Sequence, residues 1–354
     1  MSTIRFQTFR RILVIKPSAV GDVVHALPIL PKLRARFPEA QIDWLIRPEI
    51  ADLVRYHPAL SNVVLFDRRR LGRFGREWSA TTGLLRLLLS VWRNRYDLVV
   101  DLHGQLRSAM FCLASGSPTR LGFCHAREGA GLAYTHWIPV PTMDVHAVDR
   151  YLEINDVLGL DWDLPDFSIY LPPGAESAAQ ALLDSAGIRR EPYALVVPGT
   201  IWQTKHWRPS GFAEVGRYLA SRGLRVIVGG TPAERELTRG IVRDCPGACD
   251  LGGRTSLAEF TALIRRSAIC VTNDSGSMHL AVALNRPVVS AFGPTSPLRT
   301  GPYLRPQAVV RADIACSPCY LRKLAQCRHD HECMQALTAD MVIARIRDVL
   351  RLAA

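Results

Sequence analysis

Hydrophobic residues along this chain occur in two alternating patterns. Short runs rich in β-branched residues predict buried strands, and longer stretches with apolar residues at helical spacing predict amphipathic helices. In the first half, strands are expected at residues 12–15, 41–46, 62–66, 96–101 and 119–123. Helices are expected between them, at 22–37, from 50, up to about 95, from 106, and at 146–158. A βαβ series of this kind predicts a mostly parallel sheet covered by helices on both faces.

The alternation of predicted strands and helices stops after Asp166 and then resumes. The segment IYLPPGAE holds two adjacent prolines and a glycine, which is typical of a linker. Strands are expected beyond it at 193–197, 225–229, 269–272 and 288–292, with helices from 209, 232, 256 and 276. A final helical pattern follows at 341–352. The second half is therefore predicted to be a second parallel α/β domain.

A chain of 354 residues exceeds what one hydrophobic core usually organises, so two domains are expected. We predict an α/β fold of two doubly wound Rossmann-like domains that face each other across a cleft. The predicted bounds are 1–168 and 169–337, followed by a C-terminal helix, 338–354, for which packing back on the first domain is one arrangement. Ligands of open α/β sheets lie beyond the carboxyl ends of the strands, so the turns after the strands are the candidate sites.

Charge and composition narrow the range of partners. The net charge of +12 favours an anionic partner, which is a nucleotide, a nucleic acid or an acidic membrane surface. No recognisable nucleic-acid-binding module accompanies this charge, so nucleic acid is not the expected partner. The first residues lack the pattern of a signal peptide, and the longest apolar run, 84–92, is too short to span a bilayer. We therefore expect a cytoplasmic protein.

The first candidate site is the turn KPSAVGD after the strand at 12–15. Asp22 lies at the start of the next helix, where a carboxylate commonly caps free backbone N–H groups. The alternative is that Asp22 is a general base, with Lys16 binding an anion or keeping a neighbouring carboxylate ionised. The glycine spacing of a dinucleotide fingerprint is absent from this turn. A dinucleotide-dependent oxidoreductase or epimerase is therefore the disfavoured alternative.

The second candidate site is the segment VTNDSGSMHLAVALNRPVVSAFGPTSP. A strand ends there in Asn273-Asp274, and the turn Ser275-Gly276 leads into a helix that carries His279. A glycine turn before a helix N-terminus gathers backbone N–H donors, which suits a diphosphate. An ordinary strand-turn-helix, with a capping Asp274 and a packed His279, explains the same residues equally well.

Two further turns in the second half carry polar side chains. In VVPGTIWQTKHW, the Thr200 hydroxyl and the Lys205 ammonium could grip phosphate oxygens near one strand end. The plainer interpretation of this turn is a solvated Lys205. In GGTPAERE, Glu234 could accept hydrogen bonds from ribose hydroxyls, although glutamate is also common at the start of a helix.

Taken together, these motifs resemble one family. KPSAVGDVVHALP, PGTIWQTKHW, GGTPAERE and TNDSGSMHLAVALNRPVVSAFGPTSP are similar, in this order across nearly the whole chain, to the family 9 glycosyltransferases, the ADP-heptose:lipopolysaccharide heptosyltransferases. Within that family, QIDWLIRPE, HAREGAGLAY and VHAVDRYLE resemble the members that transfer the first heptose more than those that transfer the second.

The resemblance implies a GT-B architecture, in which the first domain binds the acceptor and the second binds the nucleotide sugar. By the same resemblance, Asp22 matches the catalytic base, Lys16 the lysine before it, and Arg127 an arginine of the acceptor-facing loop. Ile201 stands where close relatives have a second threonine, so one polar contact to the donor is expected to be missing. The positions that match residues holding ADP-heptose are Thr200, Lys205, Glu234, Asp274, Ser275, Gly276 and His279.

The reaction implied by the resemblance is an inverting transfer of heptose from ADP-heptose to the anionic, lipid-linked Kdo–lipid A inner core of lipopolysaccharide. Asp22 would take the proton of the acceptor hydroxyl, and Lys205 with backbone N–H groups would stabilise the departing ADP, so no metal is required for catalysis. Transfer to another core position, or from another nucleotide sugar, is the alternative. Closure of the two domains during turnover is also expected.

A basic stretch, DRRRLGRFGRE, suits such an acceptor. Its arginines Arg68, Arg69 and Arg70 could make bidentate contacts with phosphate and carboxylate oxygens, although arginine-rich loops are commonly just solvated. Because the acceptor is carried on a lipid, peripheral contact with the cytoplasmic face of the inner membrane is expected.

Four of the nine cysteines lie close together, as Cys316-x2-Cys319-x7-Cys327-x5-Cys333. Four thiolates in a short tract can close a tetrahedral zinc shell, but this spacing lacks the paired C-x2-C form of many zinc sites. A structural zinc site stands against unligated thiols or a disulfide as the alternatives.

Overall fold

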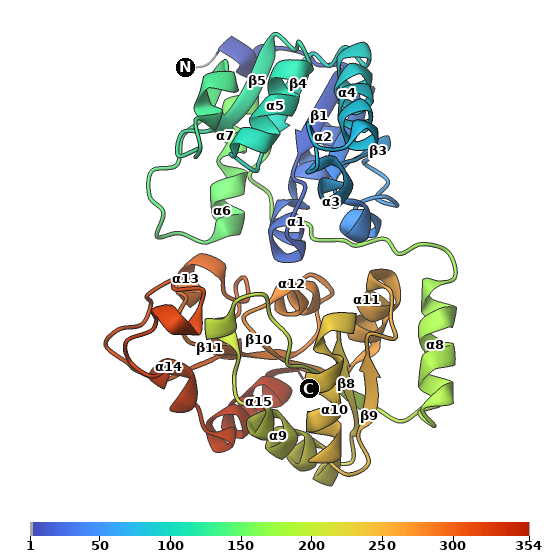
Figure 1. The fold of residues 1–354 in the computed structure, drawn as a ribbon, viewed down its shortest axis with the longest axis vertical. Helices are drawn as coiled ribbons and strands as arrows, with labels where there is room; N and C mark the ends of the chain where they lie inside the picture. The colour runs from blue at the N-terminus through green and yellow to red at the C-terminus, as the bar shows by residue number, and fades with distance from the viewer. Residues whose placement is uncertain (1–2, 354) are drawn as a thin grey trace. The chain divides into compact units, whose positions relative to one another are not determined.

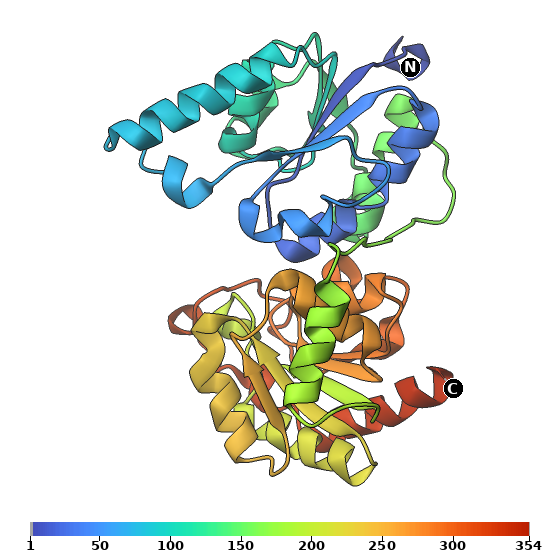
Figure 2. The ribbon, with the colours of Figure 1, turned by 90° about the vertical axis from the view of Figure 1, so that its right-hand side faces the viewer.

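The computed structural model describes residues 3–353 (Figures 1 and 2). The chain folds into two compact units, Met1–Tyr170 and Leu171–Ala354, and the junction falls inside the IYLPPGAE segment. Each unit contains one six-stranded sheet, and all paired strands run parallel. The prediction of an α/β fold with two parallel sheets is confirmed.

In the first unit, the strand order is β3-β2-β1-β4-β5-β6. The strands are β1 (Arg11–Ile15), β2 (Gln41–Ile46), β3 (Asn62–Leu65), β4 (Leu98–Asp101), β5 (Thr119–Phe123) and β6 (His136–Ile138). The helices are α1 (Val20–Ala26), α2 (Ile29–Arg36), α3 (Arg68–Leu71), α4 (Trp78–Arg93), α5 (Leu106–Ala114), α6 (Ala147–Leu152) and α7 (Ile154–Leu158). Short 3-10 helices are η1 (Thr3–Phe6), η2 (Pro48–Leu53) and η3 (Ala130–Ala133).

In the second unit, the strand order is β12-β11-β10-β7-β8-β9. The strands are β7 (Tyr193–Val197), β8 (Arg225–Gly230), β9 (Cys249–Gly252), β10 (Ile269–Asn273), β11 (Val288–Phe292) and β12 (Val309–Arg311). The helices are α8 (Ala175–Ser185), α9 (Pro209–Ser221), α10 (Arg235–Arg243), α11 (Leu257–Arg266), α12 (Gly276–Ala283), α13 (Pro297–Thr300), α14 (Glu332–Gln335) and α15 (Ala339–Ala353). Short 3-10 helices are η4 (Gln203–Lys205), η5 (Pro232–Glu234), η6 (Pro306–Ala308) and η7 (Leu324–Gln326).

The two sheets are wound in the same order. In each unit the first strand lies in the interior of the sheet, the next two extend from one side of it, and the last three extend from the other. In a doubly wound sheet, ligands bind beyond the carboxyl ends of the strands where this direction reverses. That point lies between β1 and β4 in the first unit and between β7 and β10 in the second.

Two predicted helices are interrupted. The expected helix at 22–37 is divided into α1 and α2, with Pro28 between them. Proline has no N–H to donate to the preceding turn, so a continuous helix through Pro28 would lose a hydrogen bond. The expected helix at 146–158 is likewise two helices, α6 and α7, which meet at Glu153.

Three strands were not predicted, and all three lie at edges of the sheets. They are β6, β9 and β12, which have three or four residues each and are only partly buried. An edge strand needs fewer apolar residues than a central strand, because one side of it is not paired. Its sequence therefore carries little of the pattern that identifies β1 or β7.

The C-terminal helix α15 completes the core of the second unit. Its residues Val342, Ile346 and Val349 are buried in the same cluster as Phe212 and Leu219 of α9. The helix packs on α9 and β11 of the second unit, whereas the sequence had left packing on the first domain open. Within residues 3–353, no helix combines the length and the apolar character needed to cross a bilayer.

Candidate functional site

Lys16 follows β1 directly and is buried at the switch point of the first unit. Its Nζ donates a hydrogen bond to the Leu102 carbonyl oxygen at 2.9 Å and lies 5.0 Å from the centre of the Tyr151 ring. Burial opposes the charge of Lys16, but the carboxylate of Asp22 and the neighbouring Tyr151 outweigh this, and the pKa of Lys16 is raised. Lys16 is therefore a fixed buried cation beside Asp22.

Asp22 lies in the first turn of α1, as the sequence predicted. Its Oδ2 accepts a hydrogen bond from the Ala19 N–H at 3.1 Å, which confirms the capping interpretation. The same carboxylate is close enough to Lys16 to raise the pKa of the ammonium group. Capping thus fixes the carboxylate beside a buried cation, in an orientation that an isolated side chain would lack. The two interpretations of Asp22 are compatible.

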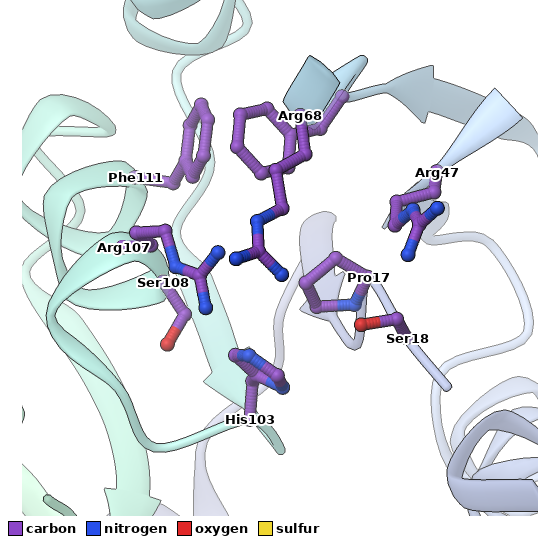
Figure 3. A pocket seen from close by; sticks show the side chains of 9 residues that line it. Pro17, Ser18, Arg47, Arg68, His103, Arg107, Ser108 and Phe111 are labelled. Atoms are coloured by element: carbon purple, nitrogen blue, oxygen red, sulfur yellow. The ribbon is translucent and has the colours of Figure 1, made fainter. Parts of the chain in front are cut away.

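A pocket lies next to this turn, and arginines from three separate elements line it (Figure 3). Arg47 follows β2, Arg68 begins α3, and Arg107 lies in the first turn of α5. Figure 3 shows the guanidinium groups of Arg68 and Arg107 side by side, with Arg47 facing the same space and His103 below. The lining also includes Pro17 and Ser18, Ser108, Phe66 and Phe111, so that it contains no carboxylate.

The charges in this pocket are only partly balanced. The pKa of Arg107 is lowered, first by burial and then by the positive charge of Arg68, while Glu128 acts in the opposite direction. The Arg47 guanidinium forms an ion pair with Glu49 at 3.1 Å. Burial, with the positive charge of Lys16, lowers the pKa of His103 to about 4, so this imidazole is neutral at pH 7. An oxyanion in the pocket would relieve the repulsion between the guanidinium groups.

Asp101, the last residue of β4, shapes the loop that carries His103. Its Oδ1 accepts hydrogen bonds from the backbone N–H groups of His103 and Gly104, at 2.8 and 3.1 Å. Its Oδ2 accepts one from the Tyr134 hydroxyl at 2.8 Å. Asp101 is fully buried, and this burial raises its pKa. The carboxylate therefore acts as an internal anchor for the pocket wall.

The predicted acceptor-binding arginines are only partly brought together. Arg68 lines the pocket, but Arg69 and Arg70 do not. The backbone N–H groups of Arg69 and Arg70 both donate to Asp67 Oδ1 at 3.0 Å, and their side chains are exposed. Arg127 is exposed outside the lining, although its N–H donates to the Gly104 carbonyl oxygen at 2.8 Å.

Three of the residues that line the pocket were not predicted from the sequence, namely Arg47, His103 and Arg107. Arg47 directly follows β2, and His103 follows β4 by two residues. The rule that sites lie beyond the carboxyl ends of strands would have found these two. Arg107 has no comparable signal, because only the packing of α5 against the strand-end loops places it in the pocket.

In the second unit, Lys205 and Asp274 form an ion pair. The Lys205 Nζ lies 2.6 Å from Asp274 Oδ2, and the two side chains are only 14% and 3% exposed. Asp274 Oδ2 also accepts a hydrogen bond from the Thr295 hydroxyl at 2.6 Å. Lys205 is therefore not the solvated side chain of the plainer interpretation. Asp274 directly follows β10, at the switch point of this sheet.

Hydrogen bonds join the loop after β7 to the loop after β10. The Thr200 hydroxyl donates to the Asp274 carbonyl oxygen at 3.1 Å. The Asn273 side chain donates to the Pro198 carbonyl oxygen at 2.7 Å and accepts from the Trp207 N–H at 3.2 Å. These bonds fix the segment that carries Lys205, because they tie it to a buried strand at both of its ends.

Glu234 lies against the backbone of the same loop. Its Oε2 accepts a hydrogen bond from the Thr231 N–H at 2.7 Å. A Cβ atom added to Gly199 would lie only 2.1 Å from Glu234 Oε1, so a larger residue at this position would displace the Glu234 carboxylate. Glu234 is therefore close to Thr200, although the two residues follow different strands. The carboxylate can accept hydrogen bonds from hydroxyl groups of a ligand at this edge.

The start of α12 completes this edge of the sheet. Ser275 is the N-cap residue and Gly276 the first residue of the helix, which follows β10. The Ser275 hydroxyl shares a hydrogen bond with the Thr272 hydroxyl at 2.9 Å. His279 is buried one turn further along α12. The helix N-terminus and Lys205 together supply donors and positive charge suited to a diphosphate.

Trp202 is a further residue of this site that the sequence analysis missed. The Lys205 Nζ lies 4.5 Å from the centre of the Trp202 ring, and the Arg322 guanidinium lies 4.7 Å from it. An aromatic ring within this distance of two cations stabilises both of them. Ile201, the position that departs from the family pattern, is 86% exposed.

The four clustered cysteines lie near enough to one another for three of them to affect the pKa of the fourth. The pKa of Cys333 is raised to about 11, first by burial and then by electrostatic interaction with Cys319, Cys316 and Cys327. All nine cysteines are free thiols. Among residues 3–353, no three His, Cys, Asp or Glu side chains gather in a group that could hold a metal ion. The zinc site stays a prediction, and elemental analysis of the reduced protein is its test.

The two units, each with a doubly wound parallel sheet, define the GT-B class of glycosyltransferase folds. The glycosyltransferase family 9 structure from Veillonella parvula has this fold, with a TM-score of 0.81, 20% identity and 98% of each chain covered. The structure of E. coli heptosyltransferase WaaC with ADP-2-deoxy-2-fluoro heptose gives a TM-score of 0.74 at 25% identity, covering 96% of this chain and 99% of that one.

Sequence comparison assigns the family. Residues 84–329 match the family model "Glycosyltransferase family 9 (heptosyltransferase)". Lipopolysaccharide heptosyltransferase 1 of Pseudomonas aeruginosa is 33% identical over 313 residues, which cover 87% of this chain and 86% of the relative. This chain belongs to glycosyltransferase family 9. Its similarity to heptosyltransferase I confirms the resemblance drawn from the motifs.

Proposed function

We propose that this glycosyltransferase moves heptose from ADP-heptose to the Kdo–lipid A inner core of lipopolysaccharide, with inversion at the anomeric carbon. The observation that carries the proposal is the similarity to lipopolysaccharide heptosyltransferase 1 along 87% of the chain. The E. coli relative was solved with an ADP-heptose analogue, which supports the same donor here. Both groups of predicted functional residues lie at the carboxyl ends of strands, where such ligands bind.

Asp22 is proposed as the general base. Capping of the Ala19 N–H orients its carboxylate, and the buried Lys16 ammonium beside it favours the ionised form. The carboxylate would take the proton of the acceptor hydroxyl as that oxygen attacks the anomeric carbon. General base catalysis of this kind contributes a factor of about 10² to 10⁴ in rate. Lys16 touches Leu102 and Tyr151 and is a positioning residue for Asp22.

Lys205 and the N-terminus of α12 are proposed to bind the diphosphate of the donor. An ammonium group has three N–H donors, so Lys205 can bind a phosphate oxygen while it stays paired with Asp274. Asp274 and Trp202 hold the ammonium group in place before the donor arrives. Charge that develops on the departing ADP would then meet a preorganised cation and backbone donors, without a metal ion. Glu234 is proposed to accept hydrogen bonds from ribose hydroxyls.

The pocket formed by Arg47, Arg68 and Arg107 is proposed to bind an oxyanion of the acceptor. Phosphates and Kdo carboxylates of the inner core are the oxyanions available, and guanidinium groups bind both in a bidentate manner. Pro17 and Ser18 line the same pocket and lie in the turn that leads to Asp22. The pocket would therefore anchor the acceptor close to the base.

Replacement of Asp22 tests the proposal. Asp22→Asn keeps the size of the side chain but cannot take a proton, and kcat is expected to fall by about 10²-fold or more. The affinity for ADP, measured by titration calorimetry, should stay unchanged, because Asp22 lies in the other unit. Asp97→Asn is the matched control, since Asp97 also accepts backbone N–H groups but at the opposite end of β1. An Asp22→Asn enzyme with the wild-type transfer rate would overturn the assignment of the base.

A further inference from the structure

The long helix α4 carries a row of large apolar side chains on its exposed face. Trp78, Leu85, Leu89 and Trp92 are all exposed, Trp78 by 83% and Trp92 by 56%. At 3.6 residues per turn, these four positions fall within roughly 60° of the helix circumference. We call these four residues the α4 stripe. Water-exposed apolar residues are common singly, but four large ones on the same face of a helix need an explanation.

The α4 stripe lies on a different face of the helix from the one that packs against the rest of the unit. Ala80, Leu84 and Val91 form the buried face of the helix, and Leu84 and Val91 belong to the core cluster of the first unit. The helix packs against α3 and α5. In Figure 2, α4 is the long cyan helix whose N-terminal end extends away from the sheet of its unit. Removal of the stripe would therefore leave the core of the unit unchanged.

Arginines accompany the α4 stripe. Arg86 and Arg93 are exposed, and each follows a stripe residue, so both flank the same side of the row. Residues 67–95 contain eight arginines, against the two carboxylates of Asp67 and Glu77. Phe74, in the turn before α4, is 54% exposed. The surface thus combines exposed tryptophan and leucine with an excess of positive charge.

We propose that the α4 stripe and its flanking arginines dock on an anionic membrane surface. An apolar row bordered by cations is the pattern of a helix that lies in the interface of a bilayer, where tryptophan is a favoured residue. The apolar side chains would enter the boundary between headgroups and acyl chains, and the arginines would meet anionic headgroups. A second protein copy carries the same excess of positive charge at this surface, so charge complementarity favours the lipid.

Binding to lipid vesicles tests this proposal without donor or acceptor. The variant Trp78→Ser/Leu85→Gln/Leu89→Gln removes three exposed residues, and circular dichroism should show an unchanged fold. Wild-type protein should cosediment with vesicles of phosphatidylglycerol and phosphatidylcholine, and less with pure phosphatidylcholine or at high salt. The triple variant should bind the mixed vesicles at least about tenfold more weakly. Trp162→Ser is the matched control, because Trp162 is also 56% exposed and lies outside α4.

Two results would overturn the proposal. One is equal binding of the triple variant and the wild type to the mixed vesicles. The other is a dimer of the wild-type protein in sedimentation velocity that the triple variant converts to a monomer, because the stripe would then cover a second copy. Transfer to a water-soluble, deacylated acceptor should be the same in both proteins. That measurement separates a failure of the docking surface from a failure of the proposed function.

Discussion

The ion pair of Lys205 and Asp274 allows us to predict how much stability is lost when Lys205 is replaced. Lys205→Met keeps the length of the side chain but leaves Asp274, which is 3% exposed, with Thr295 as its remaining identified side-chain donor. Loss of one partner of a buried pair costs about 3 to 5 kcal/mol. Lys205 is itself 14% exposed and the Thr295 hydroxyl still donates, so we expect a loss near the lower end, about 3 kcal/mol.

The double variant Lys205→Met/Asp274→Asn should recover most of this loss, because it removes the buried charge as well as its partner. Native-state hydrogen exchange of peptides that cover β10 would measure the stability of the second unit in the intact chain. In parallel, Lys205→Met should weaken ADP binding by about 10- to 100-fold, as one charged hydrogen bond is lost. A loss of stability below about 1 kcal/mol, or strictly additive effects in the double variant, would refute the reasoning.

Two other predictions concern the pocket of the first unit. In steady-state kinetics, Arg107→Ala should raise the KM for a phosphorylated acceptor by about tenfold and leave the KM for the donor unchanged. Arg70→Ala, which lies outside the pocket, should change neither KM. An equal rise in the acceptor KM for both variants would contradict the pocket assignment. Burial lowers the pKa of His103 in the folded chain to about 4. Well above pH 6.5 the imidazole is therefore neutral in the folded and the unfolded chain alike. As the pH falls from 6.5 to 4, the unfolded chain takes up the proton while the imidazole of the folded chain stays mostly neutral. Folding should therefore lose about 2 to 3 kcal/mol over this range, and His103→Gln should show a correspondingly smaller loss in urea unfolding at pH 7 and pH 4.

Much of the residue cluster around Lys205 and Asp274 could be predicted from the sequence, because its members follow strands that the apolar pattern identifies. Asp274 ends one such run, and Thr200 and Lys205 follow another. Their partners could not be predicted. That Lys205 pairs with Asp274 and lies over Trp202 depends on how two loops fold together beyond the sheet edge. The sequence alone left a solvated lysine as the plainer interpretation.

The arginine pocket could not be predicted from the sequence, apart from Arg68. The chain is rich in arginine, and a dense run such as 68–70 attracts notice, although only Arg68 of that run lines the pocket. Its companions Arg47 and Arg107 stand alone in the sequence, on either side of that run. Their convergence in one pocket depends on how the whole first unit folds, which no local pattern encodes. The role of Asp101 could not be predicted either. This residue ends an apolar strand, and nothing in the local sequence indicates that its carboxylate holds the following loop.

The shared winding order of the two sheets has a consequence for how such an enzyme diversifies. Each unit encloses its own core and carries its own set of loops beyond its strand ends, so a substitution in the loops of one unit leaves the packing of the other undisturbed. With the donor assigned to the second unit and the acceptor to the first, as proposed above, selection can retune the preferred sugar nucleotide while the saccharide that receives it stays the same, or the reverse. One ancestral scaffold could in this way supply a series of enzymes that extend the same oligosaccharide step by step.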